Sequence, residues 1–111
     1  MTHGLILVVE DNPITRKMLR FALQSEGHEV LEAGDGRTAL ELAANRPPDL
    51  ALLDYVLPDT DGLRLAESLR NLPGRSDLPV VLVTGMVSQL EDLRARAGPS
   101  ITVLQIGRAH V

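Results

Sequence analysis

The segment covering residues 50–62, LALLDYVLPDTDG, constrains the fold of this chain more than any other. Four apolar residues lead directly into an acid, Asp54, and turn residues follow before a helical pattern begins. An apolar run of this length, bounded by turn residues, predicts a strand that is buried on both faces. We therefore expect the carboxylate of Asp54 to lie where a buried strand ends and a solvent crevice begins.

Two other fully apolar runs also end in polar residues. They are residues 5–9, followed by Glu10 and Asp11, and residues 80–83, followed by Thr84 and Gly85. A mixed strand pattern at 28–32 and a last apolar run at 101–104 complete a set of five. Because the carboxyl ends of parallel strands meet at one edge of a sheet, we expect the polar residues after these strands to converge on one crevice.

Helical patterns separate the five runs. Asn12-Pro13 predicts the first helix start, and Ile14, Met18 and Phe21 follow at helical spacing. Three further helices are predicted from Asp35-Gly36 onward, after the Asp54 turn, and from Met86 to Ala97. Strict alternation of apolar strands and helices predicts a doubly wound α/β fold with a parallel sheet.

Composition limits the possible functions. The 111 residues suit one domain, and a net charge of -4 offers no basic surface for nucleic acid. The chain has no cysteine, which excludes disulfides and thiolate metal sites. No apolar run is long enough to span a membrane, and no signal-peptide pattern is present. The prediction is a cytoplasmic protein that binds neither membranes nor nucleic acid.

Three carboxylates in one crevice would repel one another unless a cation were present. A hard divalent cation such as Mg²⁺ prefers such oxygen ligands, and it would make a neighbouring carboxylate a suitable phosphoryl acceptor. Asp54 is the predicted nucleophile because it is single and central, whereas Glu10 and Asp11 form a pair suited to metal. The competing interpretation assigns all these residues to turns and helix caps, which is also how we interpret Asp59 and Asp61.

The motifs VVEDN, DYVLPDTDG and VLVTG resemble those of receiver domains of bacterial two-component response regulators, and the resemblance runs from about Leu5 to Leu104. It implies a flavodoxin-like, CheY-like fold with five parallel strands in the order 2-1-3-4-5. It also implies that Asp54 is the phosphoacceptor and that Glu10, Asp11, Asp54 and the Val56 carbonyl bind Mg²⁺. Thr84 resembles the switch hydroxyl that binds the phosphoryl group, together with the Gly85 amide. The implied partner is a histidine kinase or a histidine phosphotransfer protein.

The last strand and the tail depart from the family pattern. The family has a lysine at the end of the fifth strand, but the window around Gln105 has none, and Lys17, the only lysine, lies in the first predicted helix. Thr102 stands near the place of the family's switch aromatic residue. We therefore expect slow phosphorylation. We also expect that the fifth helix is missing and that Val81, Val83, Val103 or their neighbours are exposed to water.

The predicted domain organisation is a receiver domain over residues 1–104 and a tail outside the family pattern over residues 105–111. The tail QIGRAHV resembles the translation of a sequencing adapter, and the alternative is a naturally degenerate receiver. The predicted function is phosphoryl acceptance in a phosphorelay, by a signalling domain that is not an enzyme in the usual sense. One alternative is a phosphorylation-independent interaction module, and a metal-dependent phosphatase, which would need a general acid, ranks last.

Overall fold

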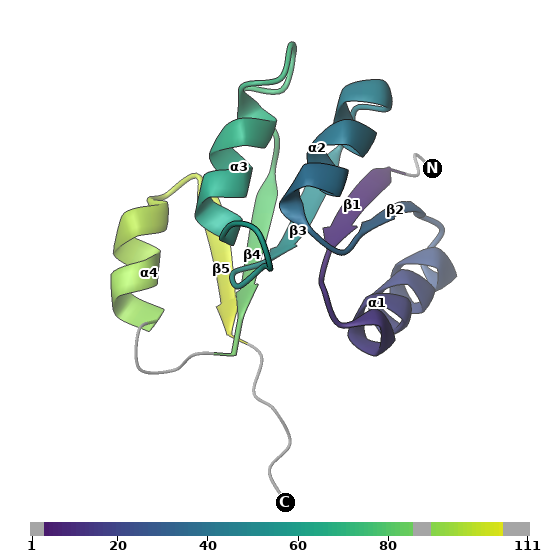
Figure 1. The fold of residues 1–111 in the computed structure, drawn as a ribbon, viewed down its shortest axis with the longest axis horizontal. Helices are drawn as coiled ribbons and strands as arrows, with labels where there is room; N and C mark the ends of the chain where they lie inside the picture. Colours follow the sequence, from purple (N-terminus) through teal and green to yellow (C-terminus); the bar gives the residue numbers. More distant parts are fainter. Residues whose placement is uncertain (1–3, 86–89, 106–111) are drawn as a thin grey trace, which may run out of the picture.

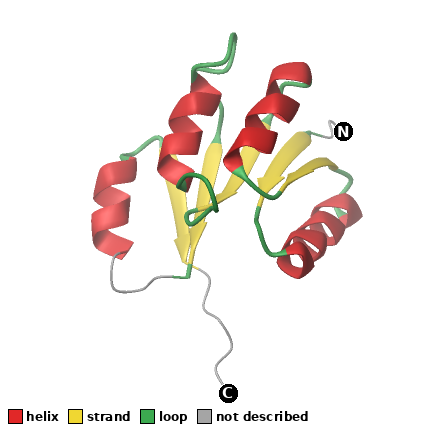
Figure 2. Cartoon of the chain, viewed as in Figure 1, coloured by secondary structure: helices red, strands yellow, loops and turns green. Residues whose placement is uncertain are grey.

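The computed structural model describes residues 4–85 and 90–105. Five strands and four helices alternate along this part of the chain (Figures 1 and 2). Their bounds are β1 Leu5–Val9, α1 Pro13–Ser25, β2 Glu29–Ala33, α2 Gly36–Asn45, β3 Leu50–Asp54, α3 Gly62–Arg70, β4 Val80–Thr84, α4 Leu90–Ala97 and β5 Ile101–Gln105. Each strand lies within one residue of its predicted position.

All four strand pairs are parallel, and the sheet order is β2-β1-β3-β4-β5. This order confirms the predicted flavodoxin-like fold. Right-handed crossovers place α1 on one face of the sheet and the other three described helices on the opposite face, because only the β1-to-β2 connection runs toward the β2 edge. Figure 1 draws α2 and α3 in front of the strands.

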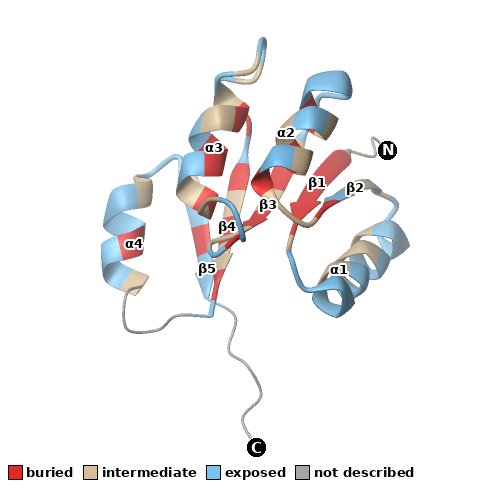
Figure 3. Cartoon of the chain, in the orientation of Figure 1, coloured by how far each residue is buried: buried red, intermediate tan, exposed pale blue. Residues whose placement is uncertain are grey.

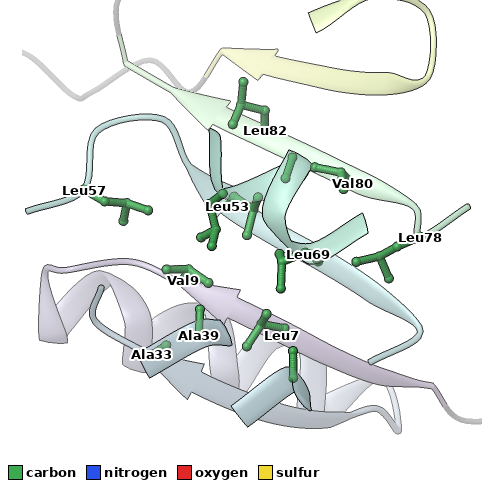
Figure 4. Close-up of a cluster of buried hydrophobic side chains, with 14 of the residues drawn as sticks. Leu7, Val9, Ala33, Ala39, Leu53, Leu57, Leu69, Leu78, Val80 and Leu82 are labelled. Carbon is green, nitrogen blue, oxygen red and sulfur yellow. The ribbon is translucent and has the colours of Figure 1, made fainter. Parts of the chain in front are cut away.

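The main core lies between the sheet and the helices α2, α3 and α4. Figure 4 shows Leu7 and Val9 of β1, Leu53 of β3 and Leu82 of β4 in one cluster with Leu69 of α3. Each of these side chains is almost completely buried. Ala39 and Ala43 of α2 and Leu65 and Leu69 of α3 complete this core.

The α1 face of the sheet is covered less completely. No residue of α1 is buried, and Ile14, Met18 and Phe21 are 71%, 66% and 54% exposed (Figure 3). On β4, Val81 and Val83 are half-buried, as the prediction of an open face requires. Val103 itself is buried because it pairs with Leu82, whose side chain faces the covered side, so the prediction was wrong for this residue. Its neighbour Leu104 is 48% exposed, as the prediction expects.

Three predictions concern residues outside the described part of the chain. Residues 86–89 and 106–111 are not described, so the helix start at Met86, the absence of a fifth helix and the origin of the tail stay predictions. Gln105, the first residue of the predicted tail, is the last residue of β5. Among the helices of residues 4–85 and 90–105, none has the length and apolar character to cross a membrane.

Candidate functional site

Three acids meet at the carboxyl ends of β1 and β3. Glu10 and Asp11 directly follow β1, and Asp54 is the last residue of β3. One carboxylate oxygen from each residue can be chosen so that all three lie within 4.8 Å of one another. The predicted convergence of these side chains is therefore present in the structure.

Local hydrogen bonds hold Glu10 and the turn that follows β1. The Glu10 amide donates to the Ala33 carbonyl at 3.0 Å, which continues the β1–β2 ladder, and Arg16 Nη1 donates to the Glu10 carbonyl at 2.8 Å. Glu10 Oε2 accepts the Asn12 amide at 3.0 Å. Asn12 caps α1, as predicted, by accepting the amides of Ile14 and Thr15. The turn after β1 is therefore held by hydrogen bonds to β2 on one side and to α1 on the other.

The electrostatics of this cluster disfavour three ionised carboxylates. Burial raises the pKa of Asp54 above its ordinary value of 3.8, and the charge of Asp11 raises it further, although the Val56 amide acts in the opposite direction. Burial also raises the pKa of Glu10 above 4.5, and the Asp54 charge adds to this effect, while the Asn12 amide opposes it. A divalent cation would relieve this cost. The donor set of two half-buried carboxylates and the exposed carboxylate of Asp11 therefore fits Mg²⁺, which prefers carboxylate and water oxygens.

The loop after Asp54 turns sharply and is closed by its own backbone. Val56 and Asp61 form an isolated antiparallel bridge, and the Gly62 amide donates to the Tyr55 carbonyl at 2.7 Å. A Cβ atom on Gly62 would lie 2.3 Å from Leu82 Cδ1 and 2.7 Å from the Asp54 carbonyl oxygen, so only glycine fits there. Asp61 caps α3, as predicted, by accepting the Arg64 amide.

Comparison with known proteins identifies the family. A family model described as the response regulator receiver domain matches residues 6–98. This chain belongs to the response regulator receiver domain family. Receiver domains are signalling domains rather than classical enzymes, so the match also supports the predicted class of protein.

Individual relatives support the same conclusion. The polar-differentiation response regulator DivK of Brucella anthropi is 32% identical over 93 residues, which cover 84% of this chain and 76% of DivK. A CheY-like receiver domain from Methylobacillus flagellatus superposes with a TM-score of 0.82 at 26% identity, covering 99% of this chain and 90% of the other. A CheY-like receiver domain protein from Methanospirillum hungatei JF-1 gives 0.79 at 28% identity, covering 94% and 82%.

The other predicted site residues of this receiver domain lie at the same edge of the sheet. Thr84 ends β4 and is almost completely buried, and Gly85 follows it at the surface. Thr84 pairs with Gln105 in the parallel register of β4 and β5, so position 105 also lies at this edge. Lys17 is in α1 with its ammonium 5.6 Å from the centre of the Phe21 ring. No described lysine therefore accompanies Thr84 on the strand ends.

Two contacts near the site were not predicted. Arg96 of α4 donates to the Tyr55 hydroxyl at 3.2 Å, although 41 residues separate them. Asp59, predicted only as a turn or cap residue, accepts the Gly36 and Arg37 amides at the start of α2. Both contacts join residues that are distant in the sequence, and local patterns carry no signal for such pairs.

Proposed function

We propose that this receiver domain accepts a phosphoryl group on Asp54 from a phosphohistidine of a histidine kinase or a histidine phosphotransfer protein. The observation that carries the proposal is the convergence of Glu10, Asp11 and Asp54 within 4.8 Å at the carboxyl edge of a receiver-type sheet. Glu10, Asp11, Asp54 and the Val56 carbonyl would bind Mg²⁺.

The transfer is a single displacement at phosphorus. A carboxylate oxygen of Asp54 forms a bond to phosphorus while the phosphorus–nitrogen bond of the phosphohistidine breaks. The electron pair of that bond returns to the imidazole, which takes up a proton, and Asp54 is left as an acyl phosphate. Mg²⁺, when bound, neutralises negative charge on the phosphoryl oxygens. The Thr84 hydroxyl and the Gly85 amide would donate hydrogen bonds to the same oxygens.

A phosphorylation assay tests the acceptor. The purified chain is incubated with a small phosphodonor and Mg²⁺, and its intact mass is measured. We expect one added phosphoryl group, lost on mild alkaline treatment because acyl phosphates are labile to base. Asp54→Asn should abolish the label. Asp77→Asn makes the same change in charge at an exposed position before β4 and should leave the label unchanged.

The same assay separates the alternative functions. A label that survives in Asp54→Asn would contradict the assignment of the acceptor. A folded wild-type chain that never becomes labelled would favour the phosphorylation-independent interaction module. We expect slow labelling, because no lysine charge at the end of β5 helps to stabilise the transferring group.

Metal binding has a separate readout. Tyr55 is the only tyrosine, the chain has no tryptophan, and Tyr55 directly follows Asp54. We expect Mg²⁺ to change Tyr55 fluorescence and Asp11→Ala to weaken this effect strongly, with circular dichroism confirming that the variant is folded. An unchanged response in Asp11→Ala would remove Asp11 from the metal site.

A further inference from the structure

Asp59 connects the loop of the proposed site to a helix that contributes no site residue. Its Oδ1 accepts the Gly36 amide at 2.9 Å, and its Oδ2 accepts the Arg37 amide at 3.0 Å. These amides belong to the first turn of α2, where backbone donors have no partner within the helix. Both amides lower the pKa of Asp59, so the carboxylate stays ionised and bound over the neutral range.

A second acid at the same helix end has a purely local role. Asp35 is the N-cap of α2 and accepts the Thr38 amide at 2.7 Å. Asp35 and Asp59 therefore share three amides of one helix start, where negative charge is favoured. Only Asp59 reaches this helix from another part of the chain. The two acids form a matched pair in which one joins two segments and the other does not.

The backbone packs closely where these segments meet. A Cβ atom on Gly36 would lie 2.6 Å from Thr60 Cγ2 and 3.4 Å from Asp59 Oδ1. The loop of residues 56–61 is closed at its base by the Val56–Asp61 bridge, and the Leu57 amide donates to the Thr60 carbonyl at 3.2 Å. These contacts close the loop, and Asp59 attaches the tip of the loop to α2.

We infer that Asp59 is a positioning residue of the metal site: by holding the 56–61 loop against the start of α2, it keeps the Val56 carbonyl in place for Mg²⁺. This inference rests on the proposed function, in which Val56 supplies a backbone ligand. Residues that orient metal ligands without touching the metal commonly change metal affinity by about 10–100-fold when they are replaced.

Three variants test the inference by titrating Mg²⁺ against Tyr55 fluorescence. Asp59→Ala should raise the dissociation constant of Mg²⁺ about tenfold. Asp35→Ala removes a nearby charge and a cap of the same helix, and it should change the constant by less than about twofold. Asp59→Asn loses the same charge as Asp59→Ala but keeps one amide acceptor, so its constant should lie between those of wild type and Asp59→Ala. Thermal unfolding without Mg²⁺ confirms that each variant is folded.

The outcomes separate positioning from charge and from the proposed function. Equal weakening in Asp59→Asn and Asp59→Ala would assign the effect to lost charge and overturn the inference. Equal weakening in Asp35→Ala and Asp59→Ala would assign it to the stability of α2 and overturn it as well. An unchanged constant in Asp59→Ala overturns the inference alone, provided that wild type responds to Mg²⁺. A wild type without any response overturns the proposed function, and the inference with it.

Discussion

The two ends of the sheet use charged residues in opposite ways. At the amino end, Asp49 accepts the Leu5 amide at 2.8 Å, and the Asp49 amide donates to the Leu5 carbonyl. Arg70, the last residue of α3, donates to the carbonyls of Leu78 and Ser100 and to the Ser100 hydroxyl. At the carboxyl end, Glu10, Asp11 and Asp54 bring like charges together.

This difference separates stability from function within one small sheet. The charges at the amino end hydrogen-bond to backbone groups at the start of β1 and just before β4 and β5, so they stabilise the fold. The charges at the carboxyl end raise the free energy of the folded state in the absence of a cation, and such a cost is typical of functional sites. The predictions below test this contrast, in order of decreasing effect.

Loss of Arg70 should give the largest change in stability. Arg70→Met keeps much of the side-chain volume but removes four hydrogen bonds, so we expect a loss of about 2–3 kcal/mol in the free energy of unfolding. Arg64→Met on the same helix removes only an exposed ion pair with Asp61 and should cost less than about 0.5 kcal/mol. Urea denaturation of both variants measures the difference. Similar losses in the two variants would show that the Arg70 contacts do not stabilise the amino end.

A lysine at the carboxyl end of the sheet should partly balance the like charges of the acids there. Gln105 pairs with Thr84, so Gln105→Lys introduces a cation near the proposed phosphoryl position. We expect the rate of labelling by a small phosphodonor to rise about tenfold, which corresponds to about 1.4 kcal/mol in the activation free energy. Gln105→Met has similar length without the charge and should not accelerate labelling. Equal rates in both variants would show that a positive charge at position 105 does not accelerate the reaction.

The two ends of β3 allow the same substitution to be compared directly. Asp49 directly precedes this strand and Asp54 ends it. Asp49→Ala should lower the free energy of unfolding by about 1 kcal/mol because the Leu5 amide loses its acceptor. Asp54→Ala should raise it by up to about 1 kcal/mol because one of three crowded carboxylates is removed. Thermal unfolding without Mg²⁺ measures whether each substitution raises or lowers the free energy of unfolding. A lower value for Asp54→Ala than for wild type would contradict the proposed difference between the two ends of the sheet.

Much of the fold and of the site follows from local sequence patterns. The alternation of apolar strands and capped helices predicted the parallel sheet, and the resemblance to receiver domains implied its strand order. The acids at the ends of β1 and β3 lie together as expected, and Thr84 ends β4 at the same edge of the sheet. These features depend on periodicity and on the geometry of parallel sheets, which act over short stretches of chain. The roles of Asp54 and Thr84 in phosphoryl transfer stay predictions.

The features that the sequence did not reveal all depend on distant neighbours. Helical spacing predicted the apolar residues of α1 but not their exposure, because periodicity does not say what covers a face. Arg70 shows no local pattern, since its acceptors lie 8 and 30 residues away. Asp59 was interpreted as a turn or cap residue, and it caps a helix that begins 23 residues earlier.

The pH dependence of stability should give the smallest and most specific effect. Glu10 and Asp54 have raised pKa values in the folded protein, so the native state binds their protons at higher pH than the unfolded chain does. Between the ordinary values of 4.5 and 3.8 and the raised values, these groups therefore lower stability as pH rises. The cost is fully present above the raised values and disappears once pH falls below the ordinary values. The stabilisation of Asp54→Ala over wild type should accordingly shrink toward zero in acid, as measured by thermal unfolding over a pH series without Mg²⁺. Asp59, whose pKa is lowered, should show the opposite sign: its contribution is present above 3.8 and is lost as pH falls through the lowered value. A constant difference between Asp54→Ala and wild type at every pH would mean that the stabilisation does not come from the charge of Asp54, and the contrast between the two ends would then need another cause.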